Sequence, residues 1–244
     1  MKRINVIAMT TVLCMILALP MLVRADVVWS EDFSSNPEER WTVIGEVNYD
    51  DSTCRGTVGV GYDTIYRASE VSIGSWSFDV QYIGETPRSP VYGGDTLNVR
   101  FMCSNPEVVP CNRYYFEMKK ASTSTGSYWY CEFGYQLGDT ETGELAEYST
   151  PELPDLRRVQ HIKITRDAAG HLTALLNSTV IMQATDTRIT TSEHFAILIG
   201  GDFAVDNIVV DDTPPAGLPL ELLAIGIGGG AVVIIVVMVI LKRR

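Results

Sequence analysis

Residue types that commonly bind metals or act as nucleophiles are scarce in this sequence, which has 3 histidines and 5 cysteines among 244 residues. The histidines, His161, His171 and His194, are scattered and form no metal-binding motif. No Gly-x-Ser-x-Gly motif, phosphate-binding loop or dinucleotide-binding motif is present. The sequence therefore lacks the common signatures of serine hydrolases, nucleotide-binding proteins and dehydrogenases.

Positive charge is also scarce between Asp26 and Thr213, where 13 Lys and Arg face 29 Asp and Glu, a net charge of −16. A surface of this charge repels the phosphates of nucleic acids and the headgroups of anionic lipids. Nucleic acid is therefore not expected as a partner. Neutral sugars, cations and basic proteins stay compatible with the charge, which also serves solubility.

Charge is absent from the centres of two apolar segments, one at each end of the chain. Residues 1–25 begin with two basic residues and continue through an apolar stretch, as in a secretory signal peptide, although Arg24 lies unusually close to the cleavage point. Residues 222–241 carry no charge and would span about 30 Å as a helix, the thickness of a bilayer core. We therefore expect a single-pass cell-membrane protein with a signal peptide (1–25), an extracellular domain (26–210), a proline-rich linker (211–220), a transmembrane helix (221–241) and a cytoplasmic basic tail (242–244).

Once Cys14 is removed with the signal peptide, the number of cysteines is even: Cys54, Cys103, Cys111 and Cys131. In an oxidising compartment such a set predicts two disulfides, for which three pairings exist. We favour Cys103–Cys111, because two prolines between them indicate a bent loop that a disulfide could close, together with Cys54–Cys131. Bound zinc is the alternative, although no Cys-x-x-Cys pair is present.

Apolar and polar residues alternate with a period of two through most of residues 26–210, as in "GSWSFDVQYIG", "DTLNVRFMC" and "HIKITRD". This period is typical of strands with one buried face, and no segment of the domain shows a helical period. In "DTLNVRFMC" it places Asn98, Arg100 and Met102 on the polar side. Short alternating strands separated by turn residues predict an all-β antiparallel sandwich or barrel.

The segment "YWYCEFGY", Tyr128–Tyr135, is the most aromatic part of the domain. Side chains of a strand alternate between two faces, so Trp129, Cys131, Phe133 and Tyr135 point into a core. We expect residues 113–135 to form a hairpin in which Met118 lies opposite Trp129 and Phe116 opposite Cys131. This register follows because it brings the apolar residues of both strands to the same face.

The opposite face of this hairpin combines aromatic rings with charged groups: Tyr115, Glu117, Lys119, Tyr128, Tyr130 and Glu132. Aromatic rings suit the C–H groups of sugars, and carboxylates accept hydrogen bonds from sugar hydroxyls. The candidate ligand-binding residues are therefore Tyr115, Glu117, Tyr128, Tyr130 and Glu132. The alternative is that the rings only cover one another as cross-strand pairs.

The domain opens with "WSEDFSSNPEERWTVIG" and closes with "FAVDNIVVDD", after the strand–turn–strand block "HIKITRDAAGHLTALLNSTVIMQATD". This order resembles the concanavalin A-like lectin/glucanase superfamily, in particular its laminin-G-like jelly rolls. The resemblance implies a two-sheet antiparallel jelly-roll sandwich whose concave face binds glycans or proteins. Glucanases of the superfamily carry a Glu-x-Asp-x-x-Glu motif, which is absent here. The linker, glycine-rich span and basic tail resemble the anchors of archaeal surface proteins.

Two further segments suggest ligands or modification. The sequon Asn177-Ser178-Thr179 predicts N-glycosylation in a turn, or serves turn geometry alone. The loop "GDTETGE", residues 138–144, has the oxygen-rich character of calcium loops, although an ordinary acidic turn is favoured. No other cofactor is expected.

The function expected from these observations is recognition or adhesion at the cell surface, with a glycan as the first-choice ligand and a surface protein as the other partner. A glycoside-processing enzyme that uses Glu117 and Glu132 is one alternative. A structural envelope protein without a specific ligand is another.

Overall fold

The computed structural model describes residues 26–50, 52–56, 63–84, 95–107, 110–123, 126–150 and 155–213. The predicted signal peptide, transmembrane helix and basic tail lie outside these residues, as does most of the predicted linker. Within the described part of the chain, no helix is long and apolar enough to cross a membrane.

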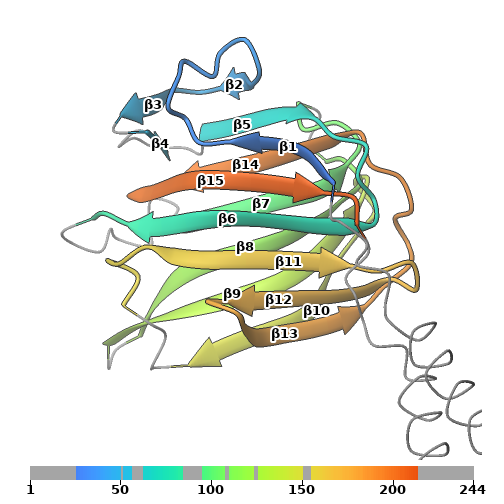
Figure 1. The fold of residues 1–244 in the computed structure, drawn as a ribbon. Coiled ribbons are helices and arrows are strands. Elements are labelled where there is room, and N and C mark those ends of the chain that lie inside the picture. Colours follow the sequence, from blue (N-terminus) through green and yellow to red (C-terminus); the bar gives the residue numbers. More distant parts are fainter. Residues whose placement is uncertain are drawn as a thin grey trace, which may run out of the picture. The chain divides into compact units, whose positions relative to one another are not determined.

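Two antiparallel β-sheets lie face to face (Figure 1). The first sheet has the order β13 (Thr179–Thr185), β12 (His171–Leu176), β11 (Gln160–Arg166), β6 (Gly74–Tyr82), β15 (Phe203–Asp211), β4 (Thr53–Gly56) and β3 (Val47–Asp50), and β1 (Val27–Glu31) also pairs with β15. The second sheet has the order β10 (Glu141–Thr150), β9 (Gly126–Leu137), β8 (Arg113–Thr123), β7 (Thr96–Cys103), β14 (His194–Gly200), β5 (Asp63–Ala68) and β2 (Thr42–Ile44). The prediction of an all-β, two-sheet antiparallel sandwich is confirmed.

A layer of aromatic rings fills the space between the sheets. On β6, Trp76 and Phe78 are fully buried while Ser77 between them is partly exposed, as the period of two predicts. The rings pack edge to face across the layer, with centroids 6.5 Å apart for Phe78 and Phe116. The largest fully buried side chains are Trp76, Tyr114, Phe78, Phe101, Phe116, Phe133, Phe195 and Phe203.

β7 departs from the predicted alternation at Met102. Its register with β14 shifts near this residue, which has a positive φ of 53°. This irregularity turns the side chain inward, where it is 1 % exposed. The placement of Met102 on the polar side was therefore wrong, whereas Asn98 and Arg100 do lie on the outer side of the sheet.

The hairpin of β8 and β9 confirms the predicted faces and corrects the predicted register by two residues. Phe116 lies opposite Phe133, and Met118 opposite Cys131. A slip of two residues leaves every side chain on its own face, so the apolar pattern alone cannot detect it. The observed register places Gly134 opposite Tyr115. A Cβ atom at position 134 would lie 2.1 Å from Cζ of the Tyr115 ring, so the ring fits only over glycine.

The positions of the cysteines contradict one of the two predicted disulfides, and the other is not formed in the structure. All four are buried free thiols. Cys103 and Cys111 are neighbours as expected, with sulfur atoms 3.3 Å apart in a hydrogen bond.

The pairing of Cys54 with Cys131 is wrong. β4 packs against β14, whereas β10, beside β9, packs against β13 at the opposite edge. In the second sheet β9 is three strands away from β14, so about three strand spacings, roughly 14 Å, separate the two cysteines along the sandwich, and a disulfide needs Cα atoms within about 7 Å.

Replacement of two aromatic residues of β9 should lower the free energy of unfolding by very different amounts. Phe133→Ala should lower the free energy of unfolding by about 3–5 kcal/mol, because it leaves a cavity in the aromatic layer. Tyr130→Ala should cost far less, because this side chain lies on the outer side and is only partly buried. Urea denaturation of residues 26–213 measures both changes. Equal losses would mean that both sides of β9 are buried.

A candidate ligand-binding face

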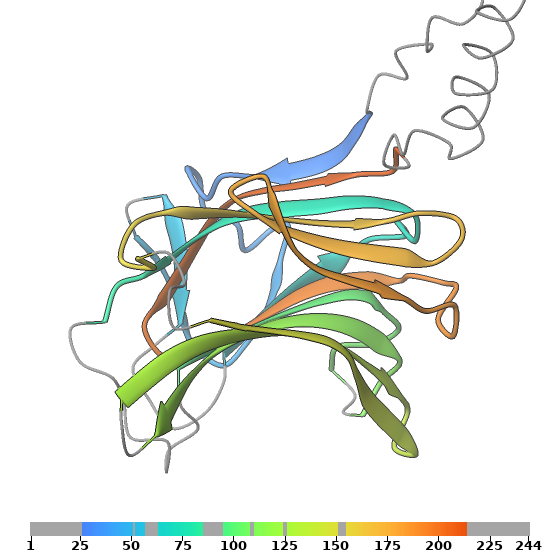
Figure 2. The ribbon, with the colours of Figure 1, turned by 90° about the horizontal axis from the view of Figure 1, so that it is seen from below.

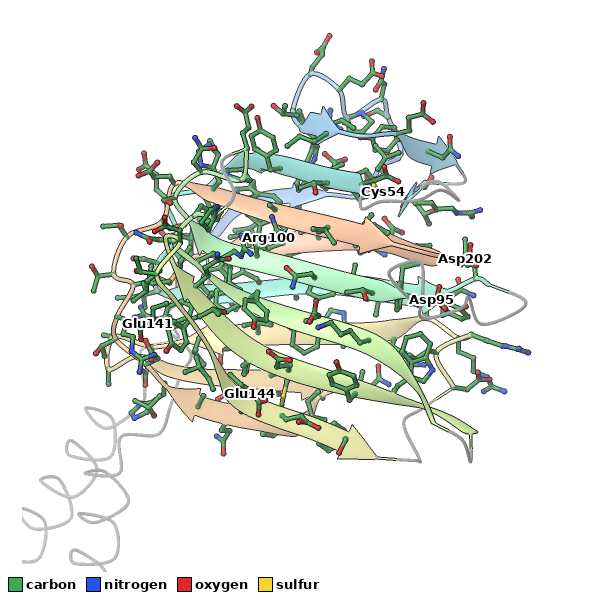
Figure 3. All side chains as sticks on the ribbon, turned by 180° about the vertical axis from the view of Figure 1, so that it is seen from behind. Cys54, Asp95, Arg100, Glu141, Glu144 and Asp202 are labelled. Atoms are coloured by element: carbon green, nitrogen blue, oxygen red, sulfur yellow. The ribbon has the colours of Figure 1, made fainter. Side chains whose placement is uncertain are left out.

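The outward side chains of β7, β8 and β9 form a mixed aromatic and charged surface, which faces the viewer in Figure 3. The strands bend so that this side of the second sheet is concave (Figure 2). Four of the five predicted ligand-binding residues have their side chains there. The fifth, Tyr128, lies on β9 opposite Ala121, and its side chain is outside the described part. We define the outer face as Asn98, Arg100, Tyr115, Glu117, Lys119, Tyr130 and Glu132.

A chain of polar contacts crosses this outer face around Glu117, which is only 8 % exposed. Its Oε1 accepts a hydrogen bond of 3.2 Å from Nδ2 of Asn98, and its carboxylate forms an ion pair with Lys119. Oδ1 of Asn98 in turn accepts a hydrogen bond of 3.2 Å from Nε of Arg100. Both carboxylate oxygens of Glu117 are thus engaged, and its orientation is fixed before any ligand arrives.

Tyr115 lies flat across β9 and holds the second carboxylate of the outer face. Its hydroxyl donates a hydrogen bond of 2.8 Å to Oε1 of Glu132, while its ring rests over Gly134. Burial raises the pKa of Tyr115, and the carboxylate of Glu132 raises it further. The tyrosine therefore remains a neutral donor. This ring does cover its neighbouring strand, as the alternative interpretation holds.

Tyr130 is the more available ring of the two. It is partly exposed, and Nζ of Lys119 lies 5.9 Å from its ring centroid. Burial raises the pKa of its hydroxyl. An aromatic surface beside a fixed carboxylate and an ammonium group is suited to a ligand that combines C–H groups with hydroxyls.

Glu117 and Glu132 lie directly opposite each other in the register of β8 and β9. Like charges in this position repel each other. The structure relieves the repulsion by giving each carboxylate its own donors, Lys119 and Asn98 on one side and Tyr115 on the other.

The candidate ligand-binding residues chosen from the sequence did not include Asn98 and Arg100 of the outer face. They also did not include the row of side chains to which Arg100 belongs. This row runs across four strands as Tyr115, Arg100, Ala196 and Tyr66. The alternation in "DTLNVRFMC" did place Asn98 and Arg100 on a polar side. It carried no information on which strand lies next to β7.

A second polar cluster occupies the far end of β7, where Figure 3 labels Asp95 and Asp202. Asp95 is 2 % exposed, and its Oδ2 accepts a hydrogen bond of 2.8 Å from the hydroxyl of Tyr82. Its Oδ1 is buried and has no donor among the described residues. A buried acceptor without a partner is costly, so this oxygen is a candidate contact for a ligand hydroxyl or a cation.

The predicted calcium loop does not assemble a set of free ligands. Residues 138–140 form a turn, and β10 begins at Glu141, which accepts a hydrogen bond of 2.8 Å from Tyr135 and lies 3.7 Å from Arg188. Within the described ranges, no group of three or more His, Cys, Asp or Glu side chains is arranged to hold a metal ion.

The predicted glycosylation site has a structural role. Asn177 lies in the turn between β12 and β13 with a positive φ of 48°. Its Oδ1 accepts a hydrogen bond from the backbone N–H of His161 at 2.9 Å, and its Nδ2 donates one of 2.6 Å to Gln160. These contacts support the turn interpretation, and glycosylation stays a prediction.

A surface pocket of about 420 Å³ lies elsewhere, beside β1 and β15, and is lined in part by Glu31, Asp32, Arg40 and Asn207. Glu31 is 3 % exposed and accepts hydrogen bonds from Arg40 at 2.9 Å and from Nε1 of Trp41 at 3.0 Å. Burial works to raise the pKa of Glu31, but these donors and the N–H of Phe33 outweigh it and hold the pKa below its ordinary value. This carboxylate therefore ties the segment after β1 to the sheet.

Comparison with known proteins shows the fold alone. No protein-family model and no curated protein sequence matches the chain. Among solved structures, carbohydrate binding module CBM66 from Bacillus subtilis has a TM-score of 0.52 and 16% identity over 70% of this chain and 92% of that one. A legume lectin-like domain from Entamoeba histolytica has a TM-score of 0.56 and 11% identity, over 77% and 97% of the two chains. The Bacillus licheniformis beta-glucanase has a TM-score of 0.53 and 10% identity, over 76% and 97%. The fold is thus a galectin- or concanavalin A-like jelly roll, as the sequence led us to expect.

Replacement of the buried carboxylate at position 31 should produce a pH-dependent loss of stability. Glu31→Gln should lower the free energy of unfolding at pH 7 by roughly 1–3 kcal/mol, because charge-assisted hydrogen bonds are lost. The folded-state pKa of Glu31 lies below the ordinary 4.5, so its contribution is full above that pH and declines as the pH falls through the lowered value. The difference between variant and wild type should therefore shrink in acid.

Urea denaturation of residues 26–213 across this pH range measures the effect, with Glu147→Gln on the exposed side of β10 as a control. If Glu31→Gln lowers the free energy of unfolding by the same amount at every pH down to acid pH, the negative charge of Glu31 does not stabilise the fold.

Proposed function

We propose that this domain binds a glycan on its outer face and works as a recognition or adhesion module at the cell surface. The observation that carries the proposal is the outer face itself: Tyr130 lies partly exposed beside Glu117, Lys119 and Glu132, whose side chains are already held in place. A ring supplies the apolar contact that a sugar needs, and the fixed polar groups supply hydrogen bonds in defined directions.

The fixed orientation of these groups favours binding. Glu117 and Glu132 are held by protein donors, so a ligand does not have to order them. Side chains that are ordered in advance lose less conformational entropy on association. This arrangement favours recognition of hydroxyl patterns over loose adsorption.

The fold neighbours lend support from a separate direction. These neighbours are a carbohydrate binding module, a legume lectin-like domain and a beta-glucanase. These descriptions concern those proteins, and at such low identity they support a glycan ligand here only as an inference from shared architecture.

Display on a membrane anchor is the second part of the proposal and rests on the sequence. The apolar segments at 1–25 and 221–241 and the basic tail at 242–244 support export of the domain with the tail left in the cytoplasm. A surface protein as partner remains compatible with the same arrangement.

A glycoside-processing enzyme is the second candidate, because Glu117 and Glu132 face each other directly. Residues opposite each other in a sheet have Cβ atoms about 4.5–5.5 Å apart, and retaining glycosidases hold their two carboxyl groups about 5–5.5 Å apart. The engagement of both oxygens of Glu117 by Asn98 and Lys119 argues for binding instead.

Binding should be saturable on a glycan array probed with residues 26–213. Tyr130→Ala should weaken the affinity for any glycan found there roughly three- to tenfold, because the stacking surface is lost. Lys163→Ala on β11 of the first sheet is the matched control and should leave binding unchanged. If the Tyr130→Ala variant keeps the wild-type affinity, the glycan-binding site does not include Tyr130 and lies elsewhere on the domain. Release of new reducing ends by the wild type, abolished in Glu117→Gln, would favour the enzyme.

The proposed topology is tested on intact cells that carry an epitope placed after Arg244. Added protease should digest or release the domain and leave the epitope untouched, because the tail lies in the cytoplasm. An epitope accessible from outside, or a domain ending at Thr213 that stays with the membrane, would contradict the anchored arrangement.

A further inference from the structure

Arg100 is a nearly buried cation on the outer face. It is 7 % exposed, and its Nε donates to Oδ1 of Asn98. Among the described residues its guanidinium forms no ion pair, since the carboxylate of Glu117 pairs with Lys119. Figure 3 labels Arg100 on the near side of the second sheet. A buried charge without a counter-ion is unfavourable, so this site calls for an anion.

Arg113 adds a second positive charge beside the first. It precedes by two residues Tyr115, which lies opposite Arg100, so the two arginines are diagonal neighbours on one side of the sheet. Its Nε is buried and has no acceptor within the part of the chain that the structure describes. Burial lowers the pKa of Arg100 to about 10, and the nearby charge of Arg113 contributes to this. Two cations brought together in an acidic domain repel each other unless an anion lies between them.

Among the described residues, the carboxylate of Glu117 attracts Arg100 but is already bound to Lys119 and Asn98. Nη1 of Arg113 lies 3.5 Å from Sγ of Cys111. A sulfur atom is a weak hydrogen-bond acceptor, so this contact satisfies Arg113 only in part. Within the described ranges, the guanidinium of Arg100 makes a hydrogen bond only to Asn98, which leaves its forked donors available.

We propose that Arg100 and Arg113 form a subsite for an anionic group of the ligand, a uronate carboxylate or a sulfate ester. This inference rests on the proposed glycan-binding function of the same face. The planar guanidinium of Arg100 would donate two parallel hydrogen bonds to two oxygens of the anion. It lies in the row between Tyr115 and Ala196, followed by Tyr66, so aromatic residues flank the subsite.

The net charge of the domain narrows the class of ligand. With a net charge of −16 over residues 26–213, the domain repels densely charged polyanions at long range. A single acidic sugar within a largely neutral chain meets less repulsion and still reaches the arginines. The ligand class is therefore a sparsely charged acidic glycan.

The experiment compares the affinities of residues 26–213 for three probes: a neutral oligosaccharide that carries one uronate, the same oligosaccharide with that carboxyl group reduced to an alcohol, and a sulfate ester of the reduced form. The wild type should bind at least one anionic probe about tenfold more tightly than the reduced probe, and the stronger of the two identifies the anion. Arg100→Met should abolish this preference, so that the ratio of the affinities for the anionic and reduced probes falls to about one. Arg188→Gln, at an arginine that contacts Tyr135, is the matched control.

Variants at Arg113 and a conservative change at Arg100 provide a second test of the subsite. If Arg100→Met does not fold, Arg113→Gln should weaken the preference and Arg100→Lys should retain part of it. Equal affinity of the wild type for charged and reduced probes, or full preference in a folded Arg100→Met variant, would overturn the subsite.

Free glucuronate and inorganic sulfate separate this inference from the proposed function. If no oligosaccharide binds but either small anion raises the Tm of the wild type and not of Arg100→Met, the subsite stands and glycan recognition is wrong. If the reduced oligosaccharide binds and neither anion has an effect, glycan recognition stands and the subsite is wrong.

Discussion

Burial of one aromatic layer between two sheets is the constraint on which the rest of this domain depends. Strands have a period of two, so each ring that enters the layer sends its neighbour to the opposite side. Phe116 and Phe133 pack at 5.9 Å in the core, and this contact sets Tyr115, Glu117 and Glu132 on the outer face. The candidate binding surface is therefore fixed by the same packing that stabilises the fold.

The charges of the outer face follow a second rule, that a buried charge needs a partner. Glu117 obeys it through Lys119 and Asn98, and Glu132 through Tyr115. Arg100 has only the neutral Asn98 as a hydrogen-bond partner among the described residues, although it is among the most buried charged residues of the domain. Local departures of this kind occur where a protein stores unfavourable energy for a ligand to relieve, which is why the arginine pair supports an inference about the ligand.

The segments that suggested the fold and the candidate binding face belong to different parts of the chain. The segments that suggested the fold, "SEDF" and "VDNI", lie side by side, with Glu31 paired to Ile208. The carboxylate of Glu31 there holds Arg40 and Trp41 in place. The outer face lies on the other sheet. Resemblance in the first region therefore carries information about architecture, and the binding proposal depends on side chains that the resemblance did not include.

The sequence by itself determined which side chains face inward and which face outward, because alternation is a local property of a strand. It thereby placed Tyr115, Glu117, Tyr130 and Glu132 together. It could not distinguish registers two residues apart, since both bury the same residues, and only the fit of the Tyr115 ring over Gly134 separates them.

Only the tertiary structure decided which strands are neighbours. Arg100 and Ala196 lie side by side although 96 positions separate them, and Cys54 and Cys131, both correctly expected inside, lie near opposite edges of the sandwich. Strand order depends on how the apolar faces of the whole chain pack together and on the closure of its long connections. No local pattern of residues encodes that order.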